Sequence, residues 1–178
     1  MKLNLFSIPI YIDDIDCSKI NIVSKNFEKT WMSETKSSHN FKNDLDNESL
    51  KYLYEKIWDL LKGDFNNNFK IILTNIWENH YIKEDYQEPH CHPQSHFSFI
   101  IYKKTNQSKT VFQSPNETTI LGYYPKTIFK ITNMFSTRFK PSLKSNQIIL
   151  FPSFLQHFVL KQSDATTIAG NLNIENME

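Results

Sequence analysis

The sequence of 178 residues contains few glycines, few cysteines and a single arginine, Arg138. Three glycines beside fourteen Phe and eight Tyr favour a compact, aromatic-rich interior over a low-complexity chain. The two cysteines, Cys17 and Cys91, lie far apart, which argues against a disulfide framework and fits a reducing compartment. No internal repeat, low-complexity tract or linker marks a second domain, and the length fits one domain over residues 1–178.

Long apolar runs and an excess charge are also missing. No segment approaches the roughly 20 apolar residues that a membrane-spanning helix needs. Residues 1–12 alternate apolar with polar side chains and lack the continuous apolar region of a signal peptide. A net charge of +1 provides no strong field toward nucleic acid or a membrane surface. We therefore expect a soluble, cytoplasmic protein.

The order of predicted elements indicates a mainly β fold. Residues 49–62 predict a helix, because apolar side chains recur three and four residues apart and Gly63 follows at a position typical of a helix end. Residues 31–46 are expected to form an ordered loop. Short aromatic or β-branched runs predict strands at residues 70–82, 96–104, 109–113, 127–139, 147–151, 156–161 and 166–174. Many short strands after one helical segment favour a double-stranded β-helix or jelly-roll barrel, with N-terminal helices packed outside.

A histidine pair in the middle of the chain suggests a metal site. Side chains alternate along an extended strand, so His90 and His92 are expected to face the same way and Cys91 the opposite way. A third ligand must come from elsewhere, and His157, at the start of a predicted late strand, is the obvious donor. Three protein ligands leave coordination positions open, which suits a catalytic ion.

Other residues near the pair compete for the same role. His96 has the parity of His92, so a four-histidine set is possible, and Glu88 has the parity of His90 and can supply a carboxylate as a second choice. His80 is interpreted as structural and His39 as solvated. A nucleophilic Cys91 is disfavoured, because a thiolate needs a base within reach and the neighbouring histidines are expected to face away from it.

A family resemblance is carried by residues 77–81, 85–95, 97–102, 150–159 and 168–172, with support from residues 5–10 and 31–33. These segments resemble a family of 2-oxoglutarate- and Fe(II)-dependent oxygenases found in bacteria and tailed phages. The resemblance spans nearly the whole chain, and the two histidine motifs are its most specific parts. The family is built on a double-stranded β-helix, in agreement with the predicted strands. If the gene belongs to a phage, the protein is expected in the host cytoplasm.

The resemblance assigns His90, His92 and His157 to Fe(II). Most 2-oxoglutarate oxygenases use two histidines and one carboxylate, whereas the middle ligand here is His92. A three-histidine set is neutral, so the iron site has one negative charge fewer. The family's basic anchor for the distal carboxylate of 2-oxoglutarate falls near Ala165, which cannot bind it.

Other residues are therefore candidates for the 2-oxoglutarate site. Lys104 is the first candidate anchor, because it shares the parity of the histidine pair, and Arg138 is the alternative. Tyr102, Thr167 and Asn171 are expected to line the cosubstrate pocket.

The resemblance implies hydroxylation of a substrate with O2 and 2-oxoglutarate, which releases succinate and CO2. A peptide, a small metabolite and a nucleobase all remain possible substrates. Residues 31–46 and 114–126 are expected to form the entrance loops. Neither the oligomeric state nor the substrate follows from the sequence.

Two further hypotheses compete with the oxygenase. In a cupin-type metal enzyme without 2-oxoglutarate, His96 takes the place of the usual glutamate, although Phe154 stands where a cupin motif has glycine. In a non-catalytic β-domain, the histidines serve stability and the aromatic residues line a groove for sugar or protein.

Overall fold

The computed structural model describes residues 7–23, 26–65, 68–123 and 137–177. Its elements, in chain order, are β1 (Tyr11–Asp14), η1 (Cys17–Lys19), β2 (Glu28–Lys29), β3 (Lys36–Ser37), α1 (Asn47–Leu61), β4 (Phe69–Tyr81), β5 (Asp85–His90), β6 (Phe97–Lys104), β7 (Thr110–Gln113), α2 (Glu117–Tyr123), β8 (Arg138–Phe139), β9 (Gln147–Pro152), β10 (His157–Gln162) and β11 (Ala165–Asn176). Within these ranges, no helix is both long and apolar enough to cross a membrane.

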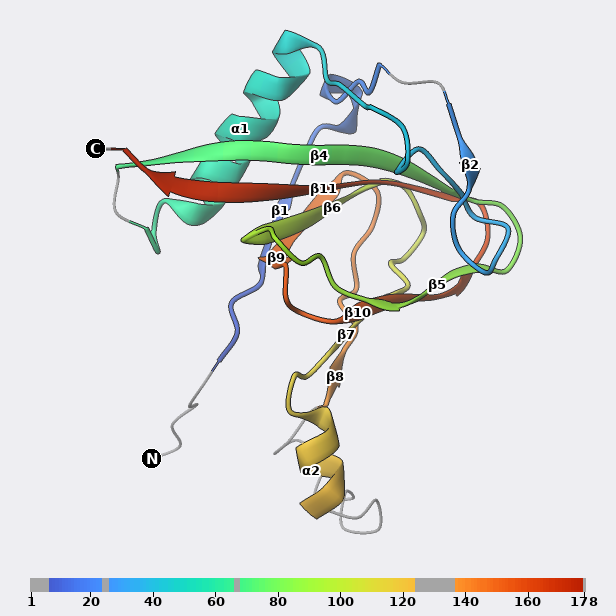
Figure 1. Ribbon diagram of the computed structural model, residues 1–178. Helices are drawn as coiled ribbons and strands as arrows, with labels where there is room; N and C mark the ends of the chain where they lie inside the picture. The colour runs from blue at the N-terminus through green and yellow to red at the C-terminus, as the bar shows by residue number, and fades with distance from the viewer. Residues whose placement is uncertain (1–6, 24–25, 66–67, 124–136, 178) are drawn as a thin grey trace.

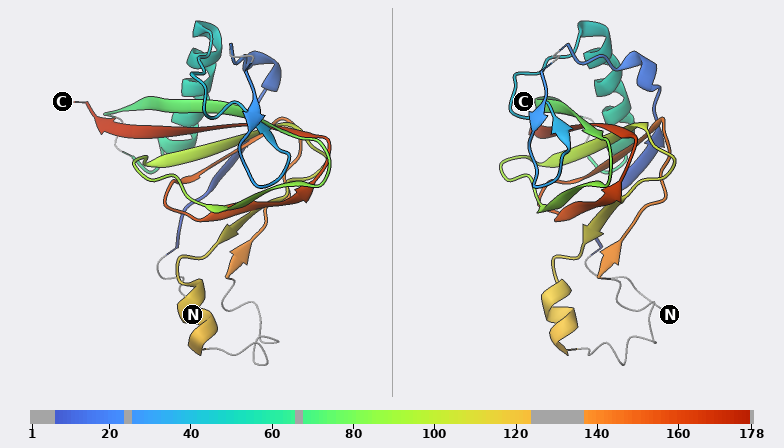
Figure 2. Two further views of the ribbon diagram at one scale, coloured as in Figure 1. Left: turned by 45° about the vertical axis from the view of Figure 1, so that its right-hand side comes forward. Right: turned by 90° about the vertical axis from the view of Figure 1, so that its right-hand side faces the viewer.

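The strands form two antiparallel sheets that face each other (Figures 1 and 2). The larger sheet has the order β1-β9-β6-β11-β4-β3-β2, and the smaller has the order β5-β10-β7-β8. The predicted double-sheet β fold is thereby confirmed. Most predicted strands match an observed one, but residues 127–136 lie outside the described ranges, and the extended segment that becomes β5 was not predicted as a strand.

Helix α1 covers the outer face of the larger sheet, as expected (Figure 1). The side chain of Asp46 caps its first turn by accepting a hydrogen bond of 2.8 Å from the backbone N–H of Ser49. Leu53, Ile57 and Leu61 lie fully buried on the face toward the sheet. Gly63 follows the helix, but its backbone does not adopt the left-handed conformation of a typical glycine cap.

A second core fills the space between the two sheets. Trp77, Tyr102, Phe112 and Phe151 are its aromatic members, and aliphatic side chains such as Ile149 pack among them. Gly170 on β11 has no room for a side chain, since a Cβ atom there would meet a ring carbon of Phe99 at 2.5 Å. The packed interior fixes the relative position of the sheets, and with it the geometry of any site between them.

Helix α2 projects from the side opposite α1 (Figure 1). It was not predicted, since the segment 114–126 was expected to be a loop. The buried carboxylate of Glu117 accepts a hydrogen bond of 2.9 Å from Nε of Arg138 and another from Gln113. These contacts tie the start of α2 to β7 and β8.

Candidate metal centre and adjoining pocket

Three histidines converge between the two sheets. His90 ends β5, and His157 begins β10 directly opposite it in the antiparallel pairing. His92 lies just beyond β5 and not on the strand, where its backbone N–H donates a 2.9 Å hydrogen bond to the carbonyl of Ser153. The side chain of His92 nevertheless lies beside those of His90 and His157, while Cys91 is exposed.

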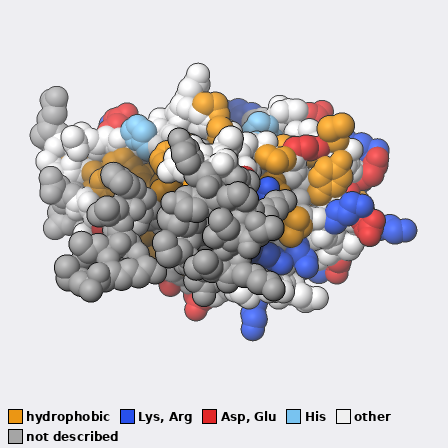
Figure 3. Space-filling view, turned by 90° about the horizontal axis from the view of Figure 1, so that it is seen from below, with side chains coloured by type: hydrophobic (Ala, Val, Ile, Leu, Met, Phe, Trp, Pro, Cys, Tyr) orange, Lys and Arg blue, Asp and Glu red, His pale blue; other side chains and the backbone are white. Residues whose placement is uncertain are grey.

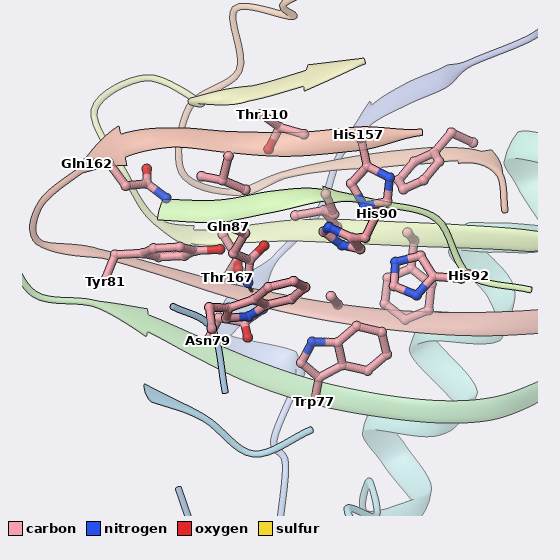
Figure 4. A pocket seen from close by; sticks show the side chains of 16 residues that line it. Trp77, Asn79, Tyr81, Gln87, His90, His92, Thr110, His157, Gln162 and Thr167 are labelled. Carbon is pink, nitrogen blue, oxygen red and sulfur yellow. Dashed lines mark hydrogen bonds between the residues drawn. The ribbon is translucent and has the colours of Figure 1, made fainter. Parts of the chain in front are cut away.

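The three imidazoles can hold one metal ion. One nitrogen from each ring lies within 4.8 Å of the others. The ring centroids of His90 and His157 are 4.3 Å apart, and each lies 5.2 Å from that of His92. Figure 4 shows the three rings gathered at one end of a pocket.

Backbone carbonyls orient two of these rings. Nδ1 of His90 lies 2.7 Å from the carbonyl of Glu88, and Nδ1 of His157 lies 3.0 Å from the carbonyl of Leu155. A carbonyl only accepts hydrogen bonds, so each Nδ1 carries the proton and each Nε2 keeps its lone pair. Histidines that bind metals through Nε2 are commonly oriented by such a hydrogen bond from Nδ1.

Burial keeps the three imidazoles neutral. Loss of hydration lowers the pKa of His90, and it lowers the pKa of His92 to about 4 together with repulsion from His90. The pKa of the almost fully buried His157 is lowered well below its ordinary value for the same reasons, burial first. Neutral imidazole is the form that binds a metal ion.

Aromatic rings surround the histidines. The indole of Trp31 lies 4.6 Å from His90 between ring centroids, and that of Trp77 lies 5.6 Å from His92. Phe151 lies 4.9 Å from His157. Trp31 belongs to the segment 31–46, which was expected to be an entrance loop, and its indole N–H is buried without a partner. The rings exclude water from most of the site and leave this N–H available to a ligand.

The end of the pocket away from the histidines is polar and uncharged. It is lined by Asn79, Tyr81, Gln87, Gln162 and Thr167, with Thr110 on the opposite wall (Figure 4). Thr167 accepts a long hydrogen bond of 3.5 Å from Asn79 and also interacts with the Tyr81 hydroxyl. The amide nitrogen of Gln87 and the amide oxygen of Asn79 are buried without partners. Unpartnered buried groups of this kind indicate a place for a polar ligand.

A β-bulge places Gln87 in this pocket. Gln87 lies opposite Val159 and His90 opposite His157, so β5 has one more residue than β10 between these pairs. The extra residue brings Gln87 and His90 to the same face. It also turns Glu88 away, and its carboxylate accepts a 3.0 Å hydrogen bond from the backbone N–H of Met32. The second-choice prediction of Glu88 as a metal ligand is therefore wrong.

Neither predicted basic anchor reaches the pocket. Lys104 is 60% exposed and pairs with Asp164 at 2.5 Å. In the pairing of β6 with β11, Thr167 lies opposite Tyr102 and Thr166 lies opposite Lys104, so Lys103 is an extra residue in β6. This bulge ends the alternation of side chains, and the predicted inward orientation of Lys104 is therefore wrong. Arg138 is 57% exposed, pairs with Glu117 and lies over the ring of Phe158. Figure 3, a view of the face seen from below in Figure 1, shows Lys and Arg side chains at the surface.

The other predicted cosubstrate residues are buried, but only Thr167 lines the pocket. Tyr102 donates its hydroxyl hydrogen to Thr110 over 2.9 Å, and Asn171 accepts a 2.7 Å hydrogen bond from Ser98. Tyr102 therefore supports the pocket wall from behind, and Asn171 is used inside the larger sheet.

The remaining histidines lie elsewhere. Nδ1 of His96 accepts a 3.0 Å hydrogen bond from the backbone N–H of Ile174, so His96 does not join the metal group. His80 pairs with Glu78 at 2.8 Å, and His39 packs edge-on against Trp77. A four-histidine site formed with His96 is excluded by this geometry.

Comparisons with known proteins agree with this arrangement. A sequence profile described as "Putative 2OG-Fe(II) oxygenase" matches residues 75–169, and a search of curated proteins finds no significant match. An oxidoreductase of the 2OG-Fe(II) oxygenase family from Burkholderia pseudomallei superposes with a TM-score of 0.55 at 10% identity, over 83% of this chain and 72% of that one. A prolyl-4-hydroxylase from Pseudomonas putida gives a TM-score of 0.50 at 9% identity, over 91% and 77%. Because the profile covers more than half of the sequence, the chain belongs to the 2OG-Fe(II) oxygenase family, whose cofactors are Fe(II) and 2-oxoglutarate.

Proposed function

We propose that the chain is a 2-oxoglutarate- and Fe(II)-dependent dioxygenase in which His90, His92 and His157 bind the iron. The observation that carries the proposal is the convergence of three neutral imidazoles, with their ligand nitrogens within 4.8 Å, at one end of a polar pocket. We further propose that residues 1–178 act as one domain. The two unpaired cysteines fit the cytoplasm, or the host cytoplasm if the gene is phage-borne.

The residues present fit an iron ion. Imidazole nitrogen suits Fe(II), and three protein ligands would leave coordination positions open for other groups. The carbonyls of Glu88 and Leu155 fix two of the rings with Nε2 available. Two of the three rings are thus already oriented for an ion by the backbone.

The lining of the pocket also suits a keto acid next to the metal. Its far end offers donors from Gln87, Tyr81 and Thr167 at a place where the protein leaves the Gln87 amide N–H group without a partner. A carboxylate oxygen can satisfy that donor.

Iron held by His90, His92 and His157 would, with 2-oxoglutarate and O2, supply the oxidising chemistry, in which one oxygen atom goes to succinate as CO2 is lost and the other goes to the substrate. The protein's own side chains orient the reagents and exclude water. Trp31 and Trp77 cover the histidines with apolar surface, and the free indole N–H of Trp31 can donate a hydrogen bond to a polar group of the substrate. Hydroxylation is the proposed outcome, with a peptide, a metabolite or a nucleobase as the substrate class.

Succinate release coupled to O2 uptake tests this function. The purified protein is incubated with 2-oxoglutarate, with and without Fe(II), and compared with His157→Ala. We expect succinate and O2 consumption to depend on iron and to disappear in the variant. The proposal would be contradicted if iron-loaded wild-type protein released no succinate in this assay and bound no 2-oxoglutarate in an anaerobic titration.

The cupin-type alternative keeps one supporting observation. No Lys or Arg among the described residues lines the pocket, so a metal reaction without 2-oxoglutarate is compatible with its chemistry. Against it, His96 is bonded to the backbone of β11 and lies outside the group of three histidines, so it cannot complete a cupin ligand set. Anaerobic titration of the Fe(II) protein with 2-oxoglutarate separates the two, since only the oxygenase gives a metal-to-ligand charge-transfer band.

A further inference from the structure

We propose that uncharged donors, with Gln87 as the principal one, hold the distal carboxylate of 2-oxoglutarate, and that the neutral ligand His92 compensates for the missing basic anchor. This inference rests on the proposed function. It states how the far end of the same pocket recognises the distal carboxylate of 2-oxoglutarate. The uncharged anchor Gln87 and the uncharged metal ligand His92 then depend on each other through the total charge of the site.

The amide of Gln87 is available to a ligand. Gln87 is 6% exposed, lines the pocket and has an amide nitrogen with no hydrogen-bond partner. A buried donor of this kind costs free energy in the unliganded protein and regains it when an acceptor binds. The bulge in β5 is what turns Gln87 inward, so its position beside the metal site is built into the backbone.

The neighbouring groups are neutral donors as well. Tyr81 and Thr167 add hydroxyl groups at the same end of the pocket (Figure 4). Burial raises the pKa of Tyr81 further above its ordinary value, so its hydroxyl stays protonated and able to donate. Asn79 donates its amide N–H to Thr167, and its unpartnered atom is the amide oxygen, an acceptor, so it is not counted among the donors. The wall therefore presents the free amide N–H of Gln87 beside the hydroxyl groups of Tyr81 and Thr167.

The overall charge of the site is balanced without a basic residue. A dianionic keto acid bound to Fe(II) with three neutral imidazoles forms a neutral set, which needs no added cation. If a carboxylate replaced one imidazole, the same set would carry one net negative charge, and a buried excess charge needs a partner. Three neutral histidine ligands thus remove the need for a cation in the pocket. This agrees with the absence of Lys and Arg among the described pocket residues.

The experiment compares two ligands in the Fe(II) protein under anaerobic conditions. Binding of 2-oxoglutarate and of its 5-amide, which lacks the distal charge, is measured by the charge-transfer band and by calorimetry. The ratio of the two dissociation constants reports the charge preference of the pocket and is insensitive to a general loss of folding. The variants are Gln87→Leu, His92→Asp, Gln87→Lys and the double variant His92→Asp/Gln87→Lys.

We expect Gln87→Leu to weaken 2-oxoglutarate binding about tenfold or more, as the loss of a hydrogen bond to a charged group predicts. His92→Asp should change the ratio of the two dissociation constants about tenfold in favour of the amide, because it adds a negative charge to the site. In the double variant, the positive charge of Gln87→Lys should restore the ratio. Where His92→Asp loses iron, His92→Glu replaces it. Iron content and thermal unfolding are measured for every variant.

Lys104→Ala and Gln107→Leu serve as controls, because both residues lie on the surface away from the histidines. Neither should change either constant. A large loss of 2-oxoglutarate binding in Lys104→Ala, or an unchanged constant in Gln87→Leu, would overturn the inference. The inference would also be overturned if the ratio of the two dissociation constants did not change with the charge at residue 92. Failure of the iron-loaded wild type to bind either ligand would instead reject the proposed function.

Discussion

His157 lies directly across from His90 in the antiparallel pairing of β10 with β5, with 4.3 Å between the ring centroids. The two residues are separated by most of the C-terminal half of the sequence, yet one sheet register brings them together. Because the smaller sheet supplies both rings and the adjoining loop supplies His92, the geometry of the metal group depends on backbone hydrogen bonds and not on flexible side chains alone.

Removal of any one of these histidines should impair iron binding. For His90→Ala, His92→Ala and His157→Ala we expect Fe(II) affinity to fall at least about 100-fold, since even changes to the outer shell of a metal site typically cost about 10–100-fold. His96→Ala is the matched control, because His96 bonds to the backbone of β11 and should leave iron content unchanged. Metal analysis after dialysis is the measurement. Retention of stoichiometric iron by the His157 variant would contradict the assignment.

Trp31 should report metal binding by fluorescence. Its indole lies 4.6 Å from the ring of His90, so an open-shell ion at the histidines is expected to quench its emission. Titration of the wild type with Fe(II) should lower tryptophan fluorescence, and Trp31→Phe should remove a large part of the quenching. Trp58→Phe is the control, because Trp58 stacks on Phe69 beneath α1. Equal quenching in both variants would show that Trp31 does not lie over the site.

Gly170 should be intolerant of any side chain. A Cβ atom there would lie 2.5 Å from Phe99 and 2.8 Å from the backbone carbonyl oxygen of Asn75, which cannot move without disturbing β4. We expect Gly170→Ala to lower the free energy of unfolding by about 1–3 kcal/mol, as overpacking does. Gly63→Ala, which meets no atom within 4 Å, should be nearly neutral. Urea denaturation of both variants is the measurement, and equal stability would contradict the packing described for β11.

Glu78 should make stability depend on acid pH. Burial alone would raise its pKa, but hydrogen bonds from His80 and Lys103 outweigh burial and hold the pKa below its ordinary value. The folded state therefore favours the charged carboxylate, and its contribution to stability is present above the ordinary glutamate pKa and is lost as the pH falls through the lowered one. Glu78→Gln should flatten this part of the stability profile, measured by denaturation from neutral to acid pH. An unchanged slope would contradict it.

The elements that follow simple periodicity could be predicted from the sequence. The apolar spacing in residues 49–62 predicted α1, and alternating apolar runs predicted most strands of both sheets. The three histidines were identified because two imidazoles in a short motif and a third at the start of a late strand are typical of metal ligands. Helix α2 was missed, since its seven residues are too few to show an apolar stripe at helical spacing.

Side-chain direction next to bulges could not be predicted. Strict alternation placed Glu88 and Lys104 in the site, whereas extra residues in β5 and β6 turn both of them away. The same effect hid Gln87, which alternation assigns to the opposite face from His90. A bulge depends on how two distant strands pair, and a single sequence contains no local signal for it.

Anaerobic addition of 2-oxoglutarate to the Fe(II)-loaded protein tests most directly whether the histidine site binds iron and the keto acid together. We expect a visible metal-to-ligand charge-transfer band that saturates at one 2-oxoglutarate per iron and is absent in His157→Ala. Wild-type protein that holds one iron per chain and shows no such band, with no 2-oxoglutarate binding by calorimetry, would contradict this expectation.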